Sequence, residues 1–158
     1  MRLRTLLGTG AATAATAAVG GAASSGAKDA WFRALDKPPF QPPPIAFPIV
    51  WTLLYVDIAA ASATAIDGLH EDGDVRDRAF RAALAANLVL NASWTWTFFR
   101  GHHLPAATTV AGLLAVSSAD LARRASAASR PAGLALAPYA AWCTFATVLS
   151  GAIWRRNR

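Results

Sequence analysis

Long stretches without a single charged side chain are the feature that most limits what this chain can fold into. Four of them cover residues 5–27, 82–99, 101–119 and 131–154. Each is close to the roughly 20 residues that a helix needs to cross about 30 Å of hydrocarbon. A fifth apolar stretch, at about 47–66, is interrupted only by Asp57. Because isolated strands cannot satisfy their backbone hydrogen bonds in lipid, the sequence predicts an all-α integral membrane bundle of five transmembrane helices.

The composition disfavours a water-soluble globule. Of the 158 residues 54% are hydrophobic and only 15% are charged, whereas an ordinary soluble domain has roughly 25% charged residues. The net charge of +6 is distributed in short basic groups between the apolar stretches, so a lipid bilayer is a more fitting partner than a nucleic acid. We expect one membrane domain over residues 1–158, with spans at about 5–25, 47–66, 80–99, 104–122 and 132–154.

The first apolar stretch has two interpretations. Arg2 and Arg4 followed by a weakly apolar segment are typical of a secretory signal peptide. The same stretch carries small residues at intervals of four, which would let a retained helix pack closely against another one: Gly8, Ala12, Thr16, Gly20 and Ser24. From composition alone both interpretations stay open.

The connection between the first two spans is rich in proline and cannot form a regular helix. A stiff, amphipathic segment of this kind is suited to fold over the end of the bundle as a lid, for which we select Trp31, Phe32, Arg33, Lys37, Pro42 and Pro43. The segment from Asp67 to Asp77 is acidic and is predicted to be a short solvated turn. Residues 101–104 and 123–130 are predicted to be tight connections between antiparallel helices.

Aromatic and amide side chains recur at helical spacing on three of the expected spans. Tryptophans near span ends are interpreted as interfacial anchors, whereas deeper indoles beside two asparagines suggest a pocket with flat aromatic walls and a few polar groups. Such a pocket suits a large planar apolar ligand. The candidate binding residues are Trp51, Tyr55, Asn87, Asn91, Trp94, Tyr139, Trp142, Ala146 and Leu149.

Three further polar residues are left outside this candidate site. Asp57 lies near the middle of its span, where a carboxyl group is costly, so we expect it to be protonated or hydrogen-bonded to a hydroxyl such as that of Thr13 or Thr16. His102 and His103 could ligate heme iron but are more simply polar residues of a turn. We predict no metal site and no catalytic residue.

Several motifs follow one another along the chain. They are Trp31-Phe32, Lys37-Pro38, Pro42-Pro43, the run from Phe47 to Tyr55, the run from Leu90 to Trp94, Phe98-Phe99 and the run from Pro138 to Ala146. In order and spacing, over almost the whole chain, they resemble the TspO/MBR family, the tryptophan-rich sensory proteins, whose mitochondrial members are called translocator protein or peripheral benzodiazepine receptor.

The resemblance implies five retained transmembrane helices, a proline-rich lid and a site that binds tetrapyrroles such as protoporphyrin IX and heme. It implies pocket roles for Trp51, Asn91, Trp142, Ala146 and Leu149, a homodimer, and a sensor-regulator or transporter linked to oxygen and stress. The tetrapyrrole would be a ligand, and no cofactor is obligatory. Alternatives are a light-dependent porphyrin-degrading enzyme, which would use Trp51 and Trp142, and a proton-coupled small-molecule or sterol transporter, which would use Asp57.

The chain departs from the family pattern at Ile45, Asn87, Arg100 and Ser150, which makes the ligand preference open. Basic residues are nearly equal in number at the two ends of the predicted bundle, so the charge count alone gives no orientation. The basic tail from Arg155 to Arg158 favours a cytoplasmic carboxyl terminus in a bacterial inner membrane, and the mitochondrial relatives imply the same side for the lid.

Overall fold

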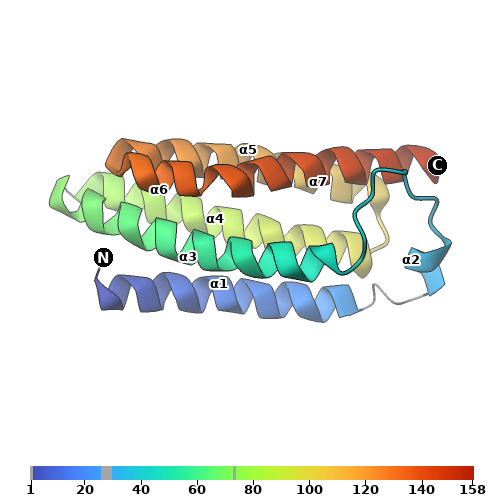
Figure 1. Ribbon diagram of the computed structural model, residues 1–158, viewed down its shortest axis with the longest axis horizontal. Helices are drawn as coiled ribbons and strands as arrows, with labels where there is room; N and C mark the ends of the chain where they lie inside the picture. Colours follow the sequence, from blue (N-terminus) through green and yellow to red (C-terminus); the bar gives the residue numbers. More distant parts are fainter. Residues whose placement is uncertain (1, 26–29, 73) are drawn as a thin grey trace.

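The computed structural model describes residues 2–25, 30–72 and 74–158, and in these residues it contains helices and no strands. Five long helical segments lie side by side, and a short helix with the proline-rich segment covers one end of the bundle (Figure 1). The all-α membrane bundle predicted from the sequence is confirmed. The helices are α1 (Leu3–Ser24), α2 (Ala30–Ala34), α3 (Ala46–Asp72), α4 (Asp74–Phe99), α5 (Leu104–Ala128), α6 (Arg130–Ala135) and α7 (Ala137–Arg156).

Four helical segments in the described part of the chain are long and apolar enough to cross a membrane. They are Leu3–Ser24, Ala46–His70, Leu104–Ala128 and Arg130–Arg156, the last combining α6 and α7. The 26-residue α4 is more polar over its first two turns, but its uncharged part packs between α1, α3 and α5. A helix enclosed in this way has to cross with its neighbours, so the chain is an integral membrane protein with α4 as the fifth crossing.

The helices extend beyond the predicted spans, and two expected connections are wrong. The segment predicted as a turn from Asp67 to Asp77 is helical in α3 and α4 on both sides of residue 73, and α5 continues through residues 123–128. Arg81 pairs with Asp77 at 2.8 Å one turn away, and Arg124 pairs with Asp120 at 2.5 Å in the same way. Charged pairs at this spacing stabilise a helix, so charge alone was a poor signal for a turn.

The first helix packs into the bundle along a face that matches the predicted one only in part. Thr16 and Gly20 of the predicted small-residue stripe are buried, together with Thr9, Thr13 and Ala23, whereas Gly8 and Ala12 of the stripe are exposed. The Thr9 hydroxyl donates to the carbonyl of Ala59 at 2.8 Å, which ties α1 to α3. The close contact therefore uses threonines whose hydroxyls donate to backbone carbonyls, as expected for helices in lipid.

Two hydrophobic clusters hold the bundle together. The larger one lies toward the α3–α4 end and includes Ile58, Ile66, Phe80, Leu121 and Leu136. The smaller one lies below the lid and centres on Phe98, Leu104, Ala107, Leu149 and Ile153, with Trp31 and Phe32 of α2 packed against it. The lid is thus part of a core rather than a loose connection.

Candidate functional site

A cavity of about 830 Å³ lies inside the lid half of the bundle, within the size range of small-molecule sites. Residues of four long helices and of the lid surround it. Its lining is Ala17, Gly20, Gly21 and Ser24 of α1, Phe32, Arg33, Lys37, Gln41 and Pro44 of the lid, Phe47, Pro48, Trp51, Thr52 and Tyr55 of α3, Asn91, Trp94, Thr95, Phe98 and Phe99 of α4, and Leu149, Ser150 and Ile153 of α7.

Trp51 is the centre of an aromatic cluster at this cavity. Its ring centroid lies 5.6 Å from that of Tyr55, 6.4 Å from that of Trp94 and 6.5 Å from that of Trp142. The indole planes of Trp51 and Trp94 are inclined by only 34°, whereas those of Trp51 and Trp142 are nearly perpendicular, at 87°. Two similarly oriented indoles on the cavity wall offer a surface on which a planar ring system can stack.

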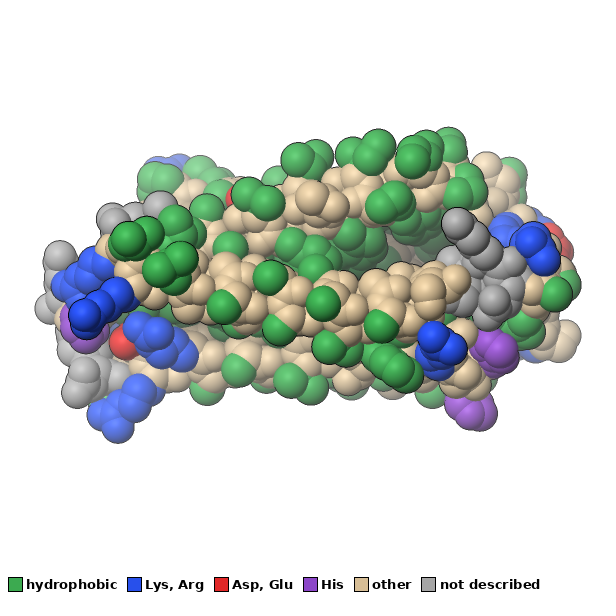
Figure 2. Space-filling view, turned by 90° about the horizontal axis from the view of Figure 1, so that it is seen from below, with side chains coloured by type: hydrophobic (Ala, Val, Ile, Leu, Met, Phe, Trp, Pro, Cys, Tyr) green, Lys and Arg blue, Asp and Glu red, His purple; other side chains and the backbone are tan. Residues whose placement is uncertain are grey.

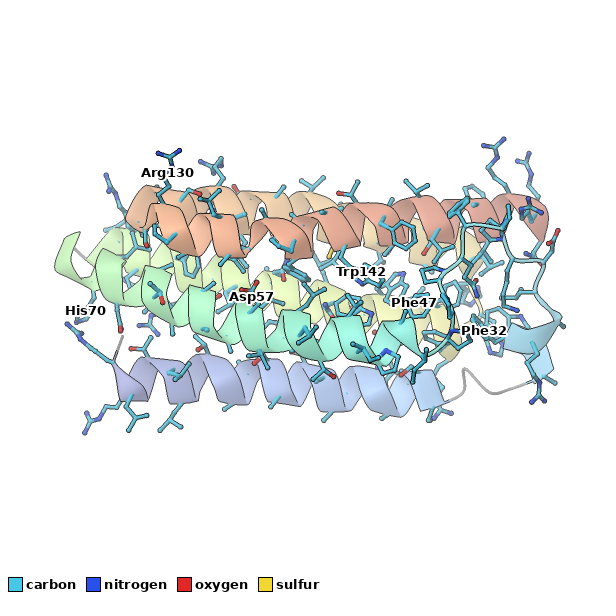
Figure 3. The ribbon with its side chains drawn as sticks, viewed as in Figure 1. Phe32, Phe47, Asp57, His70, Arg130 and Trp142 are labelled. Atoms are coloured by element: carbon cyan, nitrogen blue, oxygen red, sulfur yellow. The ribbon has the colours of Figure 1, made fainter. Side chains whose placement is uncertain are left out.

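The structure divides the predicted binding residues into two groups. Trp51, Tyr55, Asn91, Trp94 and Leu149 line the cavity. The other four lie outside its lining: Asn87, Tyr139, Trp142 and Ala146. Trp142 packs against Phe47 at 6.0 Å and Phe145 at 5.3 Å between α3 and α7, so it supports Trp51 from the side (Figure 3).

Four of these residues form one chain of hydrogen bonds through the bundle. The Tyr55 hydroxyl donates to Asn91 Oδ1 at 2.8 Å, and Asn91 Nδ2 donates to the Tyr139 hydroxyl at 3.2 Å. The Tyr139 hydroxyl donates to Asn87 Oδ1 at 2.8 Å, and Asn87 Nδ2 donates to the hydroxyls of two serines on α5. Asn87 and Tyr139 therefore connect the cavity wall to α5 and satisfy amides that lipid could not.

Trp94 lines the cavity, but its indole N–H takes no part in this network. Trp94 Nε1 is buried and has no hydrogen-bond partner among the described residues, and the same holds for Trp142 Nε1. A buried donor without a partner costs free energy. Trp94 therefore contributes the apolar face of its ring to the cavity, at the cost of an unpaired N–H.

The lid is fixed by specific contacts of the residues predicted for it. Trp31 stacks on His102 in the α4–α5 turn with centroids 3.9 Å apart, so this histidine holds the lid and lies outside the cavity lining. Phe32 packs on Phe98 and Phe99, and the Lys37 ammonium lies 4.7 Å from the centroid of the Phe32 ring. Arg33 and Lys37 line the cavity, whereas Pro42 and Pro43 lie in the same segment but outside the lining.

The carboxyl-terminal residues of α7 clamp the lid from the other side. The backbone N–H of Asp36 donates to Asn157 Oδ1 at 2.9 Å, and Asn157 Nδ2 donates back to the Asp36 carbonyl at 2.9 Å. Arg156 pairs with the Asp36 carboxylate at 3.3 Å. Lid and tail therefore move as one unit unless these bonds break.

The expected partner of Asp57 is wrong. The hydroxyls of Thr13 and Thr16 donate to carbonyls of their own helix, and Asp57 Oδ2 is buried without a hydrogen-bond partner among the described residues. In Figure 3 Asp57 lies on the side of α3 away from α1, and it is outside the cavity lining. The predicted pairing failed because threonine bonds to its own helix backbone at lower cost than to a side chain across an interface.

Sequence reasoning missed the wall that α1 contributes. Ala17, Gly20, Gly21 and Ser24 carry no aromatic or charged group, so nothing in their chemistry indicated a cavity. Ser150, noted only as a departure from a family pattern, is buried and also lines the cavity. Small residues become recognisable as a wall only when the opposite aromatic face is located.

The fold defines the class of protein. It is a membrane protein whose helix bundle crosses the bilayer five times and holds an aromatic cavity under a lid. The profile of the TspO/MBR family matches residues 9–155, so the chain belongs to the TspO/MBR family, as the sequence motifs indicated.

Curated relatives agree with this assignment. Protein CrtK of Rhodobacter capsulatus is 32% identical over 81% of this chain and 79% of its own length. The tryptophan-rich sensory protein of Cereibacter sphaeroides is 31% identical over 89% of this chain and 87% of its own. The translocator protein of Ovis aries is 30% identical over 81% of this chain and 75% of its own.

Proposed function

We propose that this protein binds a tetrapyrrole, such as protoporphyrin IX or heme, in the cavity under the lid and acts as a sensor-regulator or transporter of it. The observation that carries the proposal is the pair of indoles, Trp51 and Trp94, inclined by 34° on the wall of a cavity of about 830 Å³. Aromatic stacking favours planar rings. The names of the sensory and translocator relatives fit this role.

The test is a titration with protoporphyrin IX in the dark, followed by tryptophan quenching and porphyrin absorbance. Losing one stacking partner should cost on the order of 0.5 to 1.5 kcal/mol beyond the lost contact area. We therefore expect Trp51→Ala to weaken binding about two- to tenfold or more, since 1.4 kcal/mol is a factor of ten. Trp154→Ala is the matched control because Trp154 lies outside the cavity lining. Equal affinities of both variants and the wild type would show that protoporphyrin IX binds at another site.

Charge at the cavity mouth supports a ligand with carboxylates. Arg33 and Lys37 line the mouth, and the Lys37 ammonium already donates to the carbonyls of Arg33 and Leu35 at 3.4 and 3.2 Å. We therefore assign the stronger contact with a porphyrin propionate to Arg33. A diester porphyrin should bind the wild type more weakly than the free acid does, and Arg33→Gln should remove most of that difference. A difference that persists in this variant would reject the assignment.

Light-dependent porphyrin breakdown is the alternative that the cavity itself favours, because oxidisable indoles line it. Illumination of the complex followed by product analysis separates the two roles. Porphyrin that is recovered unchanged supports binding alone. Turnover that Trp51→Phe abolishes would establish an enzyme.

We also propose a homodimer. Gly8 and Ala12 lie four residues apart on the exposed face of α1, where a second helix can approach closely. A monomeric mass in mild detergent would reject the dimer.

We further propose that the protein lies in a bacterial inner membrane with lid and tail in the cytoplasm. Lid and carboxyl terminus lie at the same end of the bundle (Figure 1). Alkaline phosphatase is active only outside the cytoplasm, so a fusion after Arg158 should be inactive. An active fusion would show that the orientation is the opposite one.

A further inference from the structure

The polar contacts of α1 change partner along its length. Near its start, the backbone N–H of Arg2 and the Thr5 hydroxyl donate to Asp67 of α3, and Thr9 donates to α3 one to two turns later. Near its end, the contacts go to α4 instead. Trp96 Nε1 donates to the Val19 carbonyl at 3.2 Å, and Arg100 Nη2 donates to the Ala22 carbonyl at 3.1 Å. Toward the lid, therefore, the interhelical hydrogen bonds of α1 among the described residues go to α4 and none goes to α3.

The cavity reaches the surface where α1 and α3 are no longer fastened together. Gly21 of α1 and Pro48 and Thr52 of α3 are exposed and also line the cavity, which places them at its rim. Figure 2, which views the molecule from the α1 side, shows a hollow between these two helices toward the lid end. Thr52 is six residues into α3, about 9 Å along the axis, so this rim extends into the hydrocarbon layer.

The rim has the chemistry of an apolar passage. Its α1 side is built from Gly21 and Ser24 near Ala17, so little side-chain volume stands in the gap. Its hydroxyls are already satisfied, because Thr52 donates to the Pro48 carbonyl at 2.8 Å and Ser24 donates to the Gly21 carbonyl at 3.3 Å. A ring system passing between the helices would break no hydrogen bond there.

Entry from the lid end would be different. The reciprocal Asp36–Asn157 bonds, the Arg156 pair and the Trp31–His102 stack all hold the lid down. Opening the lid requires breaking these contacts, whereas the gap beside α1 requires none to break.

We propose that the rim formed by Gly21, Ser24, Pro48 and Thr52 is a lateral portal through which a planar apolar ligand enters the cavity from within the bilayer. The inference rests on the proposed function and adds to it the route by which the ligand enters and the place from which it comes. The ligand is taken from the hydrocarbon layer, into which an apolar ring system partitions, and the lid stays closed during entry.

The test uses a bulky side chain at the portal. A Cβ at Gly21 would meet nothing within 4 Å, so Gly21→Trp places an indole in the gap without a clash at its base. Gly10→Trp is the matched control. Gly10 lies eleven residues earlier, about three turns along the same face of α1, also meets nothing within 4 Å and does not line the cavity. Thr52→Trp approaches the same gap from α3 if Gly21→Trp does not fold.

The measurement is stopped-flow quenching of tryptophan fluorescence after liposomes that carry the protein are mixed with protoporphyrin IX, which partitions into their bilayer. We expect Gly21→Trp to slow association by about tenfold, as an added barrier of about 1.4 kcal/mol would. Gly10→Trp should keep wild-type rates. Asn157→Ala, which releases the lid from the tail, should also leave the association rate unchanged.

Other outcomes overturn the portal. An unchanged association rate in both Gly21→Trp and Thr52→Trp refutes it, as does equal slowing in Gly10→Trp. Faster association in Asn157→Ala, with no effect of Gly21→Trp, would assign entry to the lid. These results leave the proposed function intact, whereas a wild-type protein that does not bind protoporphyrin IX would overturn both.

Discussion

Removing the Tyr139 hydroxyl tests the hydrogen-bonded chain that connects the cavity to α5. Tyr139 is fully buried, and its hydroxyl accepts from Asn91 and donates to Asn87. In Tyr139→Phe both amides, which are also buried, lose a partner where neither can turn to water. Hydrogen bonds between membrane helices average about 0.6 kcal/mol and reach about 1.7. Two lost bonds therefore predict about 1 to 3 kcal/mol of destabilisation.

Tyr55→Phe is the matched control for this prediction. It removes one hydroxyl from the same chain, but Tyr55 is only half-buried at the cavity wall and makes a single bond to Asn91. We expect its cost to stay near 0.6 kcal/mol, because one average bond is lost. The assay is reversible unfolding by a denaturing detergent in mixed micelles, followed by circular dichroism.

The result that would refute the reasoning is a cost of Tyr139→Phe no larger than that of Tyr55→Phe. A second check combines Tyr139→Phe with Asn87→Leu. Because the two residues share a bond, the double variant should cost less than the sum of the single ones. Full additivity would mean that the 2.8 Å contact contributes nothing to stability.

Two further predictions concern the turns of the bundle. A Cβ at Gly133 would overlap the Ser126 side chain and lie 2.7 Å from Ser126 Cα, so Gly133→Ala should clearly lower the melting temperature. Gly8→Ala should not, because a Cβ at Gly8 meets nothing within 4 Å, and equal melting temperatures of the two variants would contradict the close contact at Gly133. His102→Ala removes the stack on Trp31, and trypsin should then cut the lid after Arg33 severalfold faster than in His103→Ala. Equal cleavage rates would show that the stack does not hold the lid.

Helical periodicity predicted the aromatic side of the site but could not resolve neighbours on one face. Asn87 and Asn91 are four residues apart and were assigned the same role. In the structure Asn91 lines the cavity, whereas Asn87 faces the serines of α5. A face about 100° wide covers two different neighbours when several helices meet. Only the tertiary arrangement distinguishes the Asn91 amide, which lines the cavity, from the Asn87 amide, which holds α4 to α5.

The errors on α1 and in the turns have a related cause. Residues at intervals of four identify a stripe, of which Thr16 and Gly20 are buried. Thr9 and Thr13 complete the buried face, because a small polar residue serves a close helix contact as well as glycine does. The acidic composition after Asp67 predicts a solvated turn. The structure instead places Asp77 of that segment in α4, where it pairs with Arg81 one turn away.

A structure of the protein crystallised with protoporphyrin IX from a lipid phase would test the central claim most directly. We predict the porphyrin ring inside the cavity, in contact with the faces of Trp51 and Trp94. A ring bound instead on the outer surface, for example at the basic hollow formed by Arg155, Arg156 and Arg158, with an empty cavity, would contradict it.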